Sequence, residues 1–157
     1  MTRVSIAAVL LGGAVLLTPF AAIAVDTEEN PAAAALDPDY AAGKKAIEAK
    51  QWSVAIAALS SAALRDTRNA DIQNYLGYAY RNAGQLDAGF RHYERALTLS
   101  PRHRGAHEYV GEAYLIVNNL AKAEEHLAAL QQICLIPCEE FEELKEKIEA
   151  YKRSGKR

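Results

Sequence analysis

A period of 34 residues constrains the fold of this 157-residue chain more than any other feature. Side chains of the same class recur three times at seven positions, and the apolar residues within each copy follow the spacing of an α-helix. A small-polar break lies between the two halves of each copy, at Lys50-Gln51, Gly84-Gln85 and Asn118-Asn119. Each copy is therefore predicted to be two amphipathic helices joined by a tight turn. The seven columns are Ala42/Leu76/Val110, Gly43/Gly77/Gly111, Ala46/Tyr80/Tyr114, Trp52/Leu86/Leu120, Ala55/Gly89/Ala123, Leu59/Tyr93/Leu127 and Ala62/Ala96/Leu130.

Glycine occupies one of these columns in all three copies, in the middle of the first helix, as Gly43, Gly77 and Gly111. Glycine inside a helix costs about 1 kcal/mol relative to alanine. Its repetition at one phase therefore indicates a steric requirement. We expect the two helices of each copy to approach closely here, because the facing column holds only the small residues Ala55, Gly89 and Ala123.

The second copy carries a pattern that resembles the tetratricopeptide repeat family. The pattern is Leu76-Gly77-x-x-Tyr80, followed by Gly84, Gly89-x-x-x-Tyr93, Ala96 and Pro101. The three copies extend the resemblance over about residues 36–136. The first copy departs most from the family, with Ala46 where a tyrosine is preferred and Thr67 where Pro101 would predict a proline.

The resemblance implies an all-α, right-handed solenoid. It has three helix-turn-helix repeats, at residues 36–69, 70–103 and 104–137. No repeat buries its apolar stripe alone, so stacked neighbours form one continuous core that needs a terminal cap. Residues 138–157 are expected to be that capping helix and a frayed tail, because its apolar side chains share one helix face. Those side chains are Phe141, Leu144, Ile148 and Tyr151.

The N-terminus is typical of a secretory signal peptide. Arg3 is followed by an uncharged apolar run, and Ala22-Ile23-Ala24 forms a small-x-small cleavage pattern. We expect residues 1–24 to be removed and residues 25–35 to form a flexible leader. The alternative is an uncleaved membrane anchor, since about 20 apolar residues span a bilayer. In either case the repeats lie outside the cytoplasm, most simply in a bacterial periplasm.

Binding is expected on the concave face, which the resemblance assigns to the first helix of each repeat. Tyrosine offers a flat apolar ring with a polar tip, and asparagine can pair with an extended peptide as both donor and acceptor. Glu108 and Glu112 are expected to face solvent at one end of this face. They disfavour capture of an acidic C-terminal tail, which some family members bind with a basic clamp. The candidate groove residues are Tyr40, Lys44, Asn74, Tyr78, Arg81, Glu108 and Glu112; the alternative is that these are ordinary solvated helix faces.

Cys134 and Cys138 are the only cysteines. In an exported segment oxidation is the default, and Pro137 ends the helix near Ile136, so that Cys138 can turn back. We therefore favour a structural disulfide, which adds about 2 kcal/mol by the chain-entropy model. It would also pin the capping helix to the last repeat.

A metal site is the alternative use of the cysteines. In an antiparallel helix pair the start of the first helix lies beside the end of the second, which would bring His107 near Cys134. Two thiolates and an imidazole suit Cu(I) or Zn(II), and the Cys-x-x-x-Cys spacing is similar to that of copper-insertion chaperones. A Cys-x-x-Cys redox motif is absent.

No enzyme constellation is found in the sequence. It contains no nucleophile on a strand-turn-helix and no phosphate-binding glycine loop, and no cofactor is expected. The net charge of −2, without a basic stripe, argues against nucleic acid. We therefore expect an exported, non-enzymatic adaptor that docks a peptide or partner protein. The alternatives are a metal-binding or thiol accessory protein and self-association through the repeat ends.

Overall fold

Helices, without strands, build residues 37–155, the part of the chain that the computed structural model describes. Within that range no helix is both long enough and apolar enough to cross a bilayer. The expected signal segment and leader, residues 1–35, lie outside the described residues. The helices are α2 (Pro38–Glu48), α3 (Trp52–Arg65), α4 (Ala70–Asn82), α5 (Leu86–Leu99), α6 (Arg104–Ile116), α7 (Leu120–Ile133) and α8 (Glu139–Arg153).

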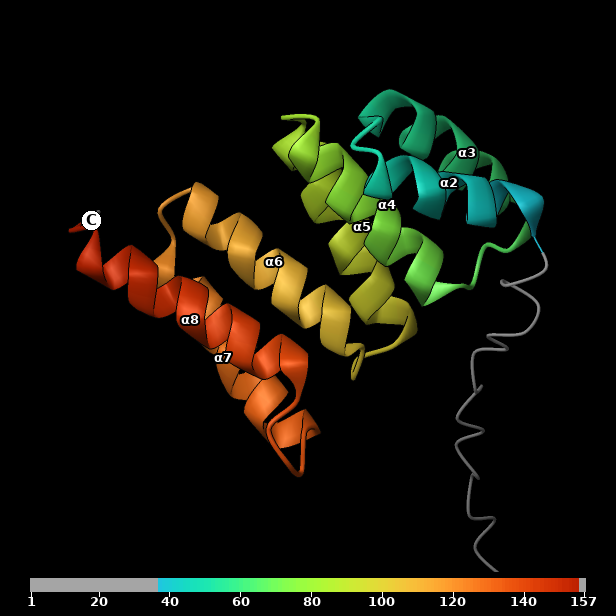
Figure 1. The fold of residues 1–157 in the computed structure, drawn as a ribbon. Coiled ribbons are helices and arrows are strands. Elements are labelled where there is room, and N and C mark those ends of the chain that lie inside the picture. The colour runs from blue at the N-terminus through green and yellow to red at the C-terminus, as the bar shows by residue number, and fades with distance from the viewer. Residues whose placement is uncertain (1–36, 156–157) are drawn as a thin grey trace, which may run out of the picture.

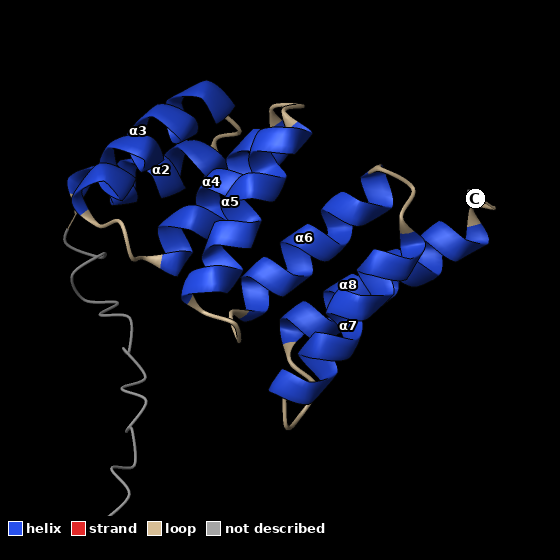
Figure 2. Cartoon of the chain, turned by 180° about the vertical axis from the view of Figure 1, so that it is seen from behind, coloured by secondary structure: helices blue, strands red, loops and turns tan. Residues whose placement is uncertain are grey.

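The helices are arranged as consecutive pairs that stack on one another. α2 packs on α3, α4 on α5 and α6 on α7, and successive pairs meet through α3 with α4 and α5 with α6 (Figure 1). The view from behind shows the same helical layers joined by short loops (Figure 2). The all-α architecture that the 34-residue period predicts is confirmed.

The last helix departs from a simple continuation of the stack. α8 contacts both α6 and α7, and it lies along α6 more closely than α4 lies along α2 (Figure 1). Its face of Leu144, Ile148 and Tyr151 is buried, as expected of a cap.

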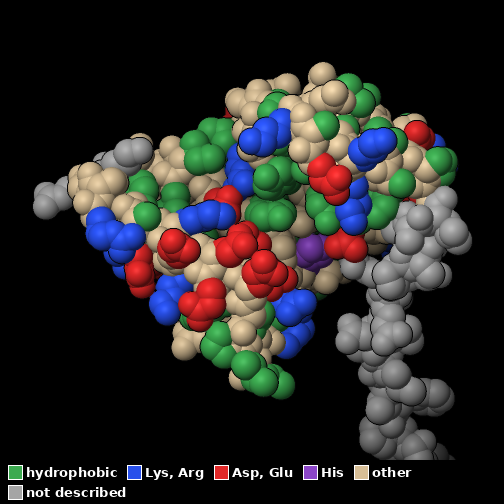
Figure 3. All heavy atoms as spheres, in the orientation of Figure 1, with side chains coloured by type: hydrophobic (Ala, Val, Ile, Leu, Met, Phe, Trp, Pro, Cys, Tyr) green, Lys and Arg blue, Asp and Glu red, His purple; other side chains and the backbone are tan. Residues whose placement is uncertain are grey.

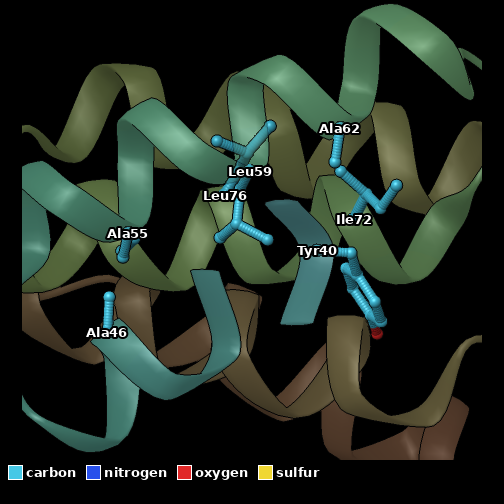
Figure 4. Packing of buried hydrophobic residues seen from close by; sticks show 8 residues of the cluster. Tyr40, Ala46, Ala55, Leu59, Ala62, Ile72 and Leu76 are labelled. Carbon is cyan, nitrogen blue, oxygen red and sulfur yellow. The ribbon is translucent and has the colours of Figure 1, made fainter. Parts of the chain in front are cut away.

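The core is continuous from one pair to the next. In the first cluster Leu59 of α3 and Leu76 of α4 lie side by side (Figure 4). A Cβ atom built on Gly43 would lie 2.5 Å from Cγ of Leu59, and one on Gly77 would lie 2.5 Å from Cδ1 of Tyr93. The close approach predicted within the first two pairs is therefore confirmed.

The third glycine makes its closest contact with a different helix. A Cβ atom on Gly111 would lie 2.6 Å from Cδ2 of Leu144, which belongs to α8. In the first two pairs the corresponding neighbour is on the second helix of the same pair. The capping helix thus fills the narrow space over the glycine of α6, and this contact sets how closely α8 approaches that helix.

Side-chain hydrogen bonds cap the start of each first helix. Asp37 caps α2 by accepting from the backbone N–H of Tyr40 at 3.0 Å, and Asn69 caps α4 by accepting from Ile72 N–H at 3.1 Å. One period after Asn69, His103 caps α6 through Nδ1. The first turn of each first helix is therefore fixed by a side-chain hydrogen bond.

The three breaks between paired helices share one backbone geometry. Their first residues, Lys50, Gly84 and Asn118, have φ of 56°, 78° and 58°. In the first break the N–H of Gln51 donates to the carbonyl of Ala46 at 2.8 Å, and that of Lys50 donates to Ile47 at 2.9 Å. The same two bonds recur one and two periods later, so all three turns are Schellman motifs.

These turns generate a stability prediction. Gly84→Ala should lower the free energy of unfolding by about 1 kcal/mol, because alanine opposes the left-handed backbone. No heavy atom lies within 4 Å of the added methyl group, so packing does not contribute. Lys50→Gly should raise the same free energy by about 1 kcal/mol. Equilibrium urea unfolding measures both changes.

The control is Ala49→Gly, one residue before the first break. Ala49 has a right-handed backbone (φ −79°, ψ 0°), so glycine there should destabilise the chain. If Lys50→Gly also destabilises it, left-handed strain is not what limits the first turn.

The second and third helix pairs, called units two and three below, each hold a tyrosine ring stacked on a histidine ring between their two helices. The rings of Tyr80 and His92 lie 5.1 Å apart between centroids, and those of Tyr114 and His126 lie 5.7 Å apart, one period later. These four residues therefore belong to the repeating packing of the fold rather than to a separate site.

The polar partner of each histidine differs between the two units. Nδ1 of His92 pairs with Oε1 of Gln73 at 2.9 Å. In unit three His107 takes the place of the glutamine, and its Nδ1 lies 2.9 Å from Nδ1 of His126. Burial lowers the pKa of His107; burial, and then the His107 charge, lowers the pKa of His126 to about 4.

The stability that these two histidines contribute should therefore fall in acid. Below pH 6.5 the unfolded chain binds protons at these histidines more readily than the folded chain does, so their contribution to the free energy of unfolding decreases as pH falls. His107→Gln copies the Gln73–His92 pair. It should leave stability at pH 7 nearly unchanged and reduce the acid loss by about 1 kcal/mol. Urea unfolding at pH 7 and pH 4.5 gives both values.

Gln73→His is the matched reverse change, and it should enlarge the acid loss through unit two. If wild type and His107→Gln show the same dependence of stability on pH, the histidine pair is not its source.

Candidate functional site

Tyrosines from the three first helices form a row along one face of the stack. Tyr40 of α2 and Tyr75 of α4 have ring centroids 5.9 Å apart. Tyr78 of α4 and Tyr109 of α6 have centroids 4.8 Å apart, and Trp52 contacts Tyr78 from the other side at 6.2 Å. Tyr40 is 8% exposed and belongs to the core, whereas Tyr75, Tyr78 and Tyr109 are partly exposed. Because each ring is packed against another, these three present aromatic surface in a fixed arrangement.

Two cations lie on this row. Lys44 Nζ lies 5.7 Å from the ring centroid of Tyr40 and 5.5 Å from that of Tyr75. Arg81 Cζ lies 5.1 Å from the centroid of Tyr78 and 5.5 Å from that of Tyr109. Each cation therefore spans two tyrosine rings, a geometry in which the ring faces attract positive charge.

Arg81 is also held by an acid. Its Nη1 donates to Oε2 of Glu112 at 2.5 Å and to the carbonyl oxygen of Tyr109 at 3.0 Å. The Arg81 and Glu112 side chains are 8% and 13% exposed, and Lys147 of α8 also contacts Glu112. Arg81 and Glu112 therefore form an ion pair and neutralise one another, so they do not give the groove a positive end and a negative end.

The expectation that Glu108 and Glu112 both face solvent is wrong. Glu108 is only 4% exposed, because α8 lies along α6 and covers it. Lys147 of α8 lies 3.9 Å from Oε1 of Glu108 and 3.6 Å from Oε2 of Glu143. The carboxylates predicted to contact a partner are part of the α6–α8 contact instead.

Glu108 is the most strongly perturbed acid on this face. Burial raises its pKa to about 9, and the neighbouring carboxyls of Glu143 and Glu112 raise it in the same direction. Glu108 therefore holds its proton at neutral pH. Its Oε1 has no hydrogen-bond partner among the described residues, and the same is true of Oδ1 of the buried Asn74.

Three separate cavities lie along the face, and α8 lines two of them. One cavity of about 470 Å³ lies where α4, α6 and α8 begin, and Asn74 and Glu108 line it. A second, of about 490 Å³, lies at the other end of α8 beside Arg81 and Leu115. A third, of about 460 Å³, surrounds Lys44 on α2. Figure 3 shows acidic side chains gathered beside a histidine on this face.

The structure sorts the residues predicted for the groove into two groups. Tyr40, Lys44, Tyr78 and Arg81 belong to the row of tyrosines and cations. Asn74 packs against Gly105 at the start of α6, whereas Glu108 and Glu112 contact Lys147 of α8. The role of all seven in binding stays a prediction.

Four residues of the face were missed by sequence reasoning. Tyr75 and Tyr109 lie one period apart and directly follow Asn74 and Glu108, so the repeat itself carried a signal for them. Glu143 and Lys147 carried none, because α8 lies beyond the third repeat.

Cys134 and Cys138 lie at the two ends of the loop between α7 and α8. The structure places their sulphur atoms at disulfide-bonding distance, with Cα atoms 5.9 Å apart, as predicted. α7 ends at Ile133 rather than near Ile136, because Cys134 already has an extended backbone (φ −89°, ψ 109°).

The alternative metal site of Cys134, Cys138 and His107 is not assembled. His107 contacts His126, which lies eight residues before Cys134 on α7, a rise of about 12 Å. Its Nε2 lies 3.1 Å from the carbonyl oxygen of Pro101. Within residues 37–155 neither cysteine joins a group of three metal-ligating side chains.

Comparisons with known proteins agree with this geometry. Residues 70–103 match the family model of the tetratricopeptide repeat. The type III secretion translocator chaperone SycD of Yersinia enterocolitica has a similar structure, with a TM-score of 0.66 and 18% sequence identity. The match covers 76% of this chain and 84% of SycD.

A second SycD structure, in complex with a peptide of the translocator YopD, is similar with a TM-score of 0.65 and 19% identity. It covers 77% of this chain and 95% of that chain. The comparison with curated protein sequences found no match. At these identities the structural likeness concerns the fold alone. Residues 70–103 are a tetratricopeptide repeat, and the helices on both sides share the fold of a helical secretion chaperone.

Proposed function

We propose that this chain is an exported, non-enzymatic scaffold that holds an extended peptide segment of a partner protein along α2, α4 and α6. The row of Tyr40, Tyr75, Tyr78 and Tyr109 carries the proposal. Its partly exposed rings, Tyr75, Tyr78 and Tyr109, come from two successive repeats and lie on one face, as a linear ligand requires. That SycD was solved with a peptide of YopD supports a peptide as the kind of partner.

The packing of the row suits it to bind without large reorganisation. Tyr78 lies between Trp52 and Tyr109, and Arg81 is fixed by Glu112. Side chains that are already ordered lose little entropy on binding. The rings can contact aliphatic or aromatic side chains of a peptide, while the three cavities along the face can receive its longer side chains.

Export rests on the N-terminal signal pattern and agrees with the cysteine pair at bonding distance. A bonded pair persists in an oxidising compartment and is rare in the cytosol. The periplasm is therefore the compartment that we propose.

Binding should depend on the tyrosine row. Peptides selected from a random library against the wild-type chain should bind Tyr78→Leu about tenfold more weakly, because one aromatic contact is lost. Fluorescence anisotropy with a labelled selected peptide gives the dissociation constants, and thermal unfolding confirms that each variant is folded.

Tyr80→Leu is the matched control. Tyr80 lies on the same helix, but its ring stacks on His92 between α4 and α5. This variant should lose stability and keep its peptide affinity. If both variants lose affinity equally, or if no peptide is selected, the face of first helices is not a peptide site.

The N-terminus provides a separate test of export. After expression of the whole chain in a bacterial host, intact-mass spectrometry of the periplasmic fraction should show a mature chain that begins at Val25. A chain that keeps residues 1–24 and stays in the membrane fraction would favour the anchor instead.

A further inference from the structure

The cavity where α4, α6 and α8 begin is strongly acidic. Five carboxyl groups line its volume of about 470 Å³, against His103 and Arg104. His103 is already paired with Asp71 at 3.0 Å, and Arg104 lies 3.5 Å from Glu140. Of the other three acids, the buried Glu108 holds its proton, and Glu139 and Glu143 supply the negative charge of the cavity. A cation is therefore the kind of ligand that its charge favours.

Two buried oxygen atoms in this cavity lack a hydrogen bond within the described chain, and Nζ of Lys147 lies 3.9 Å from Oε1 of Glu108, too far for one. Asn74 and Glu108 are each 4% exposed, and Asn74 Oδ1 and Glu108 Oε1 are unpartnered among residues 37–155. A Cβ atom on Gly105 would lie 3.1 Å from Nδ2 of Asn74, so the start of α6 packs tightly against the amide. Buried acceptors without donors are costly, so a ligand that brings several N–H donors would relieve both.

A metal ion fits the available groups less well than an organic cation. The carboxyl oxygens of Glu108, Glu112 and Glu143 come within 4.8 Å of one another. Lys147, however, already lies against all three of these acids. The open part of the cavity is walled by the two tyrosines Tyr75 and Tyr109.

Two of the chain's own cations lie over these tyrosine rings. Lys44 lies over Tyr75 and Arg81 lies over Tyr109, each 5.5 Å from the ring centroid. A further cation entering the cavity would meet the same two rings together with the unpartnered oxygens. A guanidinium supplies five N–H donors in a plane, and an ammonium supplies three.

We propose that this cavity binds the guanidinium or ammonium group of an arginine or lysine side chain in the peptide that the groove holds. The inference rests on the proposed function and adds a residue preference to it. Asn74 and Glu108 accept hydrogen bonds from the cation, Tyr75 and Tyr109 flank it, and Glu143 supplies negative charge from α8.

The cavity can be tested without any peptide. N-acetyl-arginine amide, titrated into the isotopically labelled chain, should shift the NMR signals of the Gly105 backbone amide and the Asn74 side-chain amide in a saturable manner. N-acetyl-citrulline amide, which has nearly the same shape without the charge, should not. Equal shifts from citrulline, or from calcium chloride at the same ionic strength, would overturn the proposal.

Two variants test the named acids. Glu108→Met removes the buried acceptor and should weaken arginine binding about ten- to hundredfold. It should unfold at the same or a higher temperature, because a buried unpartnered carboxyl is removed. Glu143→Gln removes an exposed charge and should weaken binding without affecting folding. Glu146→Gln, the same change on the exposed side of α8, should leave binding unaltered.

Library selection separates this proposal from the function on which it rests. Peptides selected by the wild-type chain should carry arginine or lysine at one fixed position, and Glu108→Met should lose that preference while keeping the others. Selected peptides without a basic position, together with no arginine shift, would overturn the cavity proposal and leave peptide binding standing. If no peptide is selected, the arginine titration still decides the cavity on its own.

Discussion

The close contact over the glycine column is the constraint on which the rest of this structure depends. Gly43 and Gly77 let the second helix of each pair approach, through Leu59 and Tyr93. At Gly111 the same space is taken by Leu144 of α8. Because a side chain from the capping helix occupies it, α8 lies against α6 on the face of the first helices. Gly111 thus has its closest contact with α8 instead of with the second helix of its own pair. The burial of Glu108 and the cavities beside α8 both follow from this difference.

The sequence predicted the features that repeat and not those that occur once. The period located the helix pairs, the three turns and the glycine contacts of the first two pairs. The expected export and Pro137 predicted the cysteine pair at the start of α8. Tyr75 and Tyr109 were also within reach, since they share a column. The burial of Glu108 could not be predicted from the sequence, because a glutamate on a first helix is ordinarily solvated. Glu108 is an exception because α8 covers it.

Buried titratable groups make the stability of this fold depend on pH in two opposite directions. The neutral pair of His107 and His126 weakens the folded state as pH falls below 6.5, because protons then bind more readily to the unfolded chain. Glu108 has the opposite sign. Its pKa is raised from 4.5 to about 9, so the folded chain keeps a proton that the unfolded chain releases, and stability falls as pH rises through that range. The two ranges overlap between pH 4.5 and 6.5, so the histidines and Glu108 act on stability in opposite directions there.

The position of α8 also gives the row of tyrosines two unlike ends. At α2 the row ends beside the open cavity around Lys44, whereas beyond α6 it meets the side of a helix. A further 34-residue unit added before α2 would lengthen the row by one step and leave the α6–α8 end unchanged. Two properties of such a chain can therefore change independently. One is the length of ligand that it accommodates, and the other is the chemistry that recognises one end of that ligand.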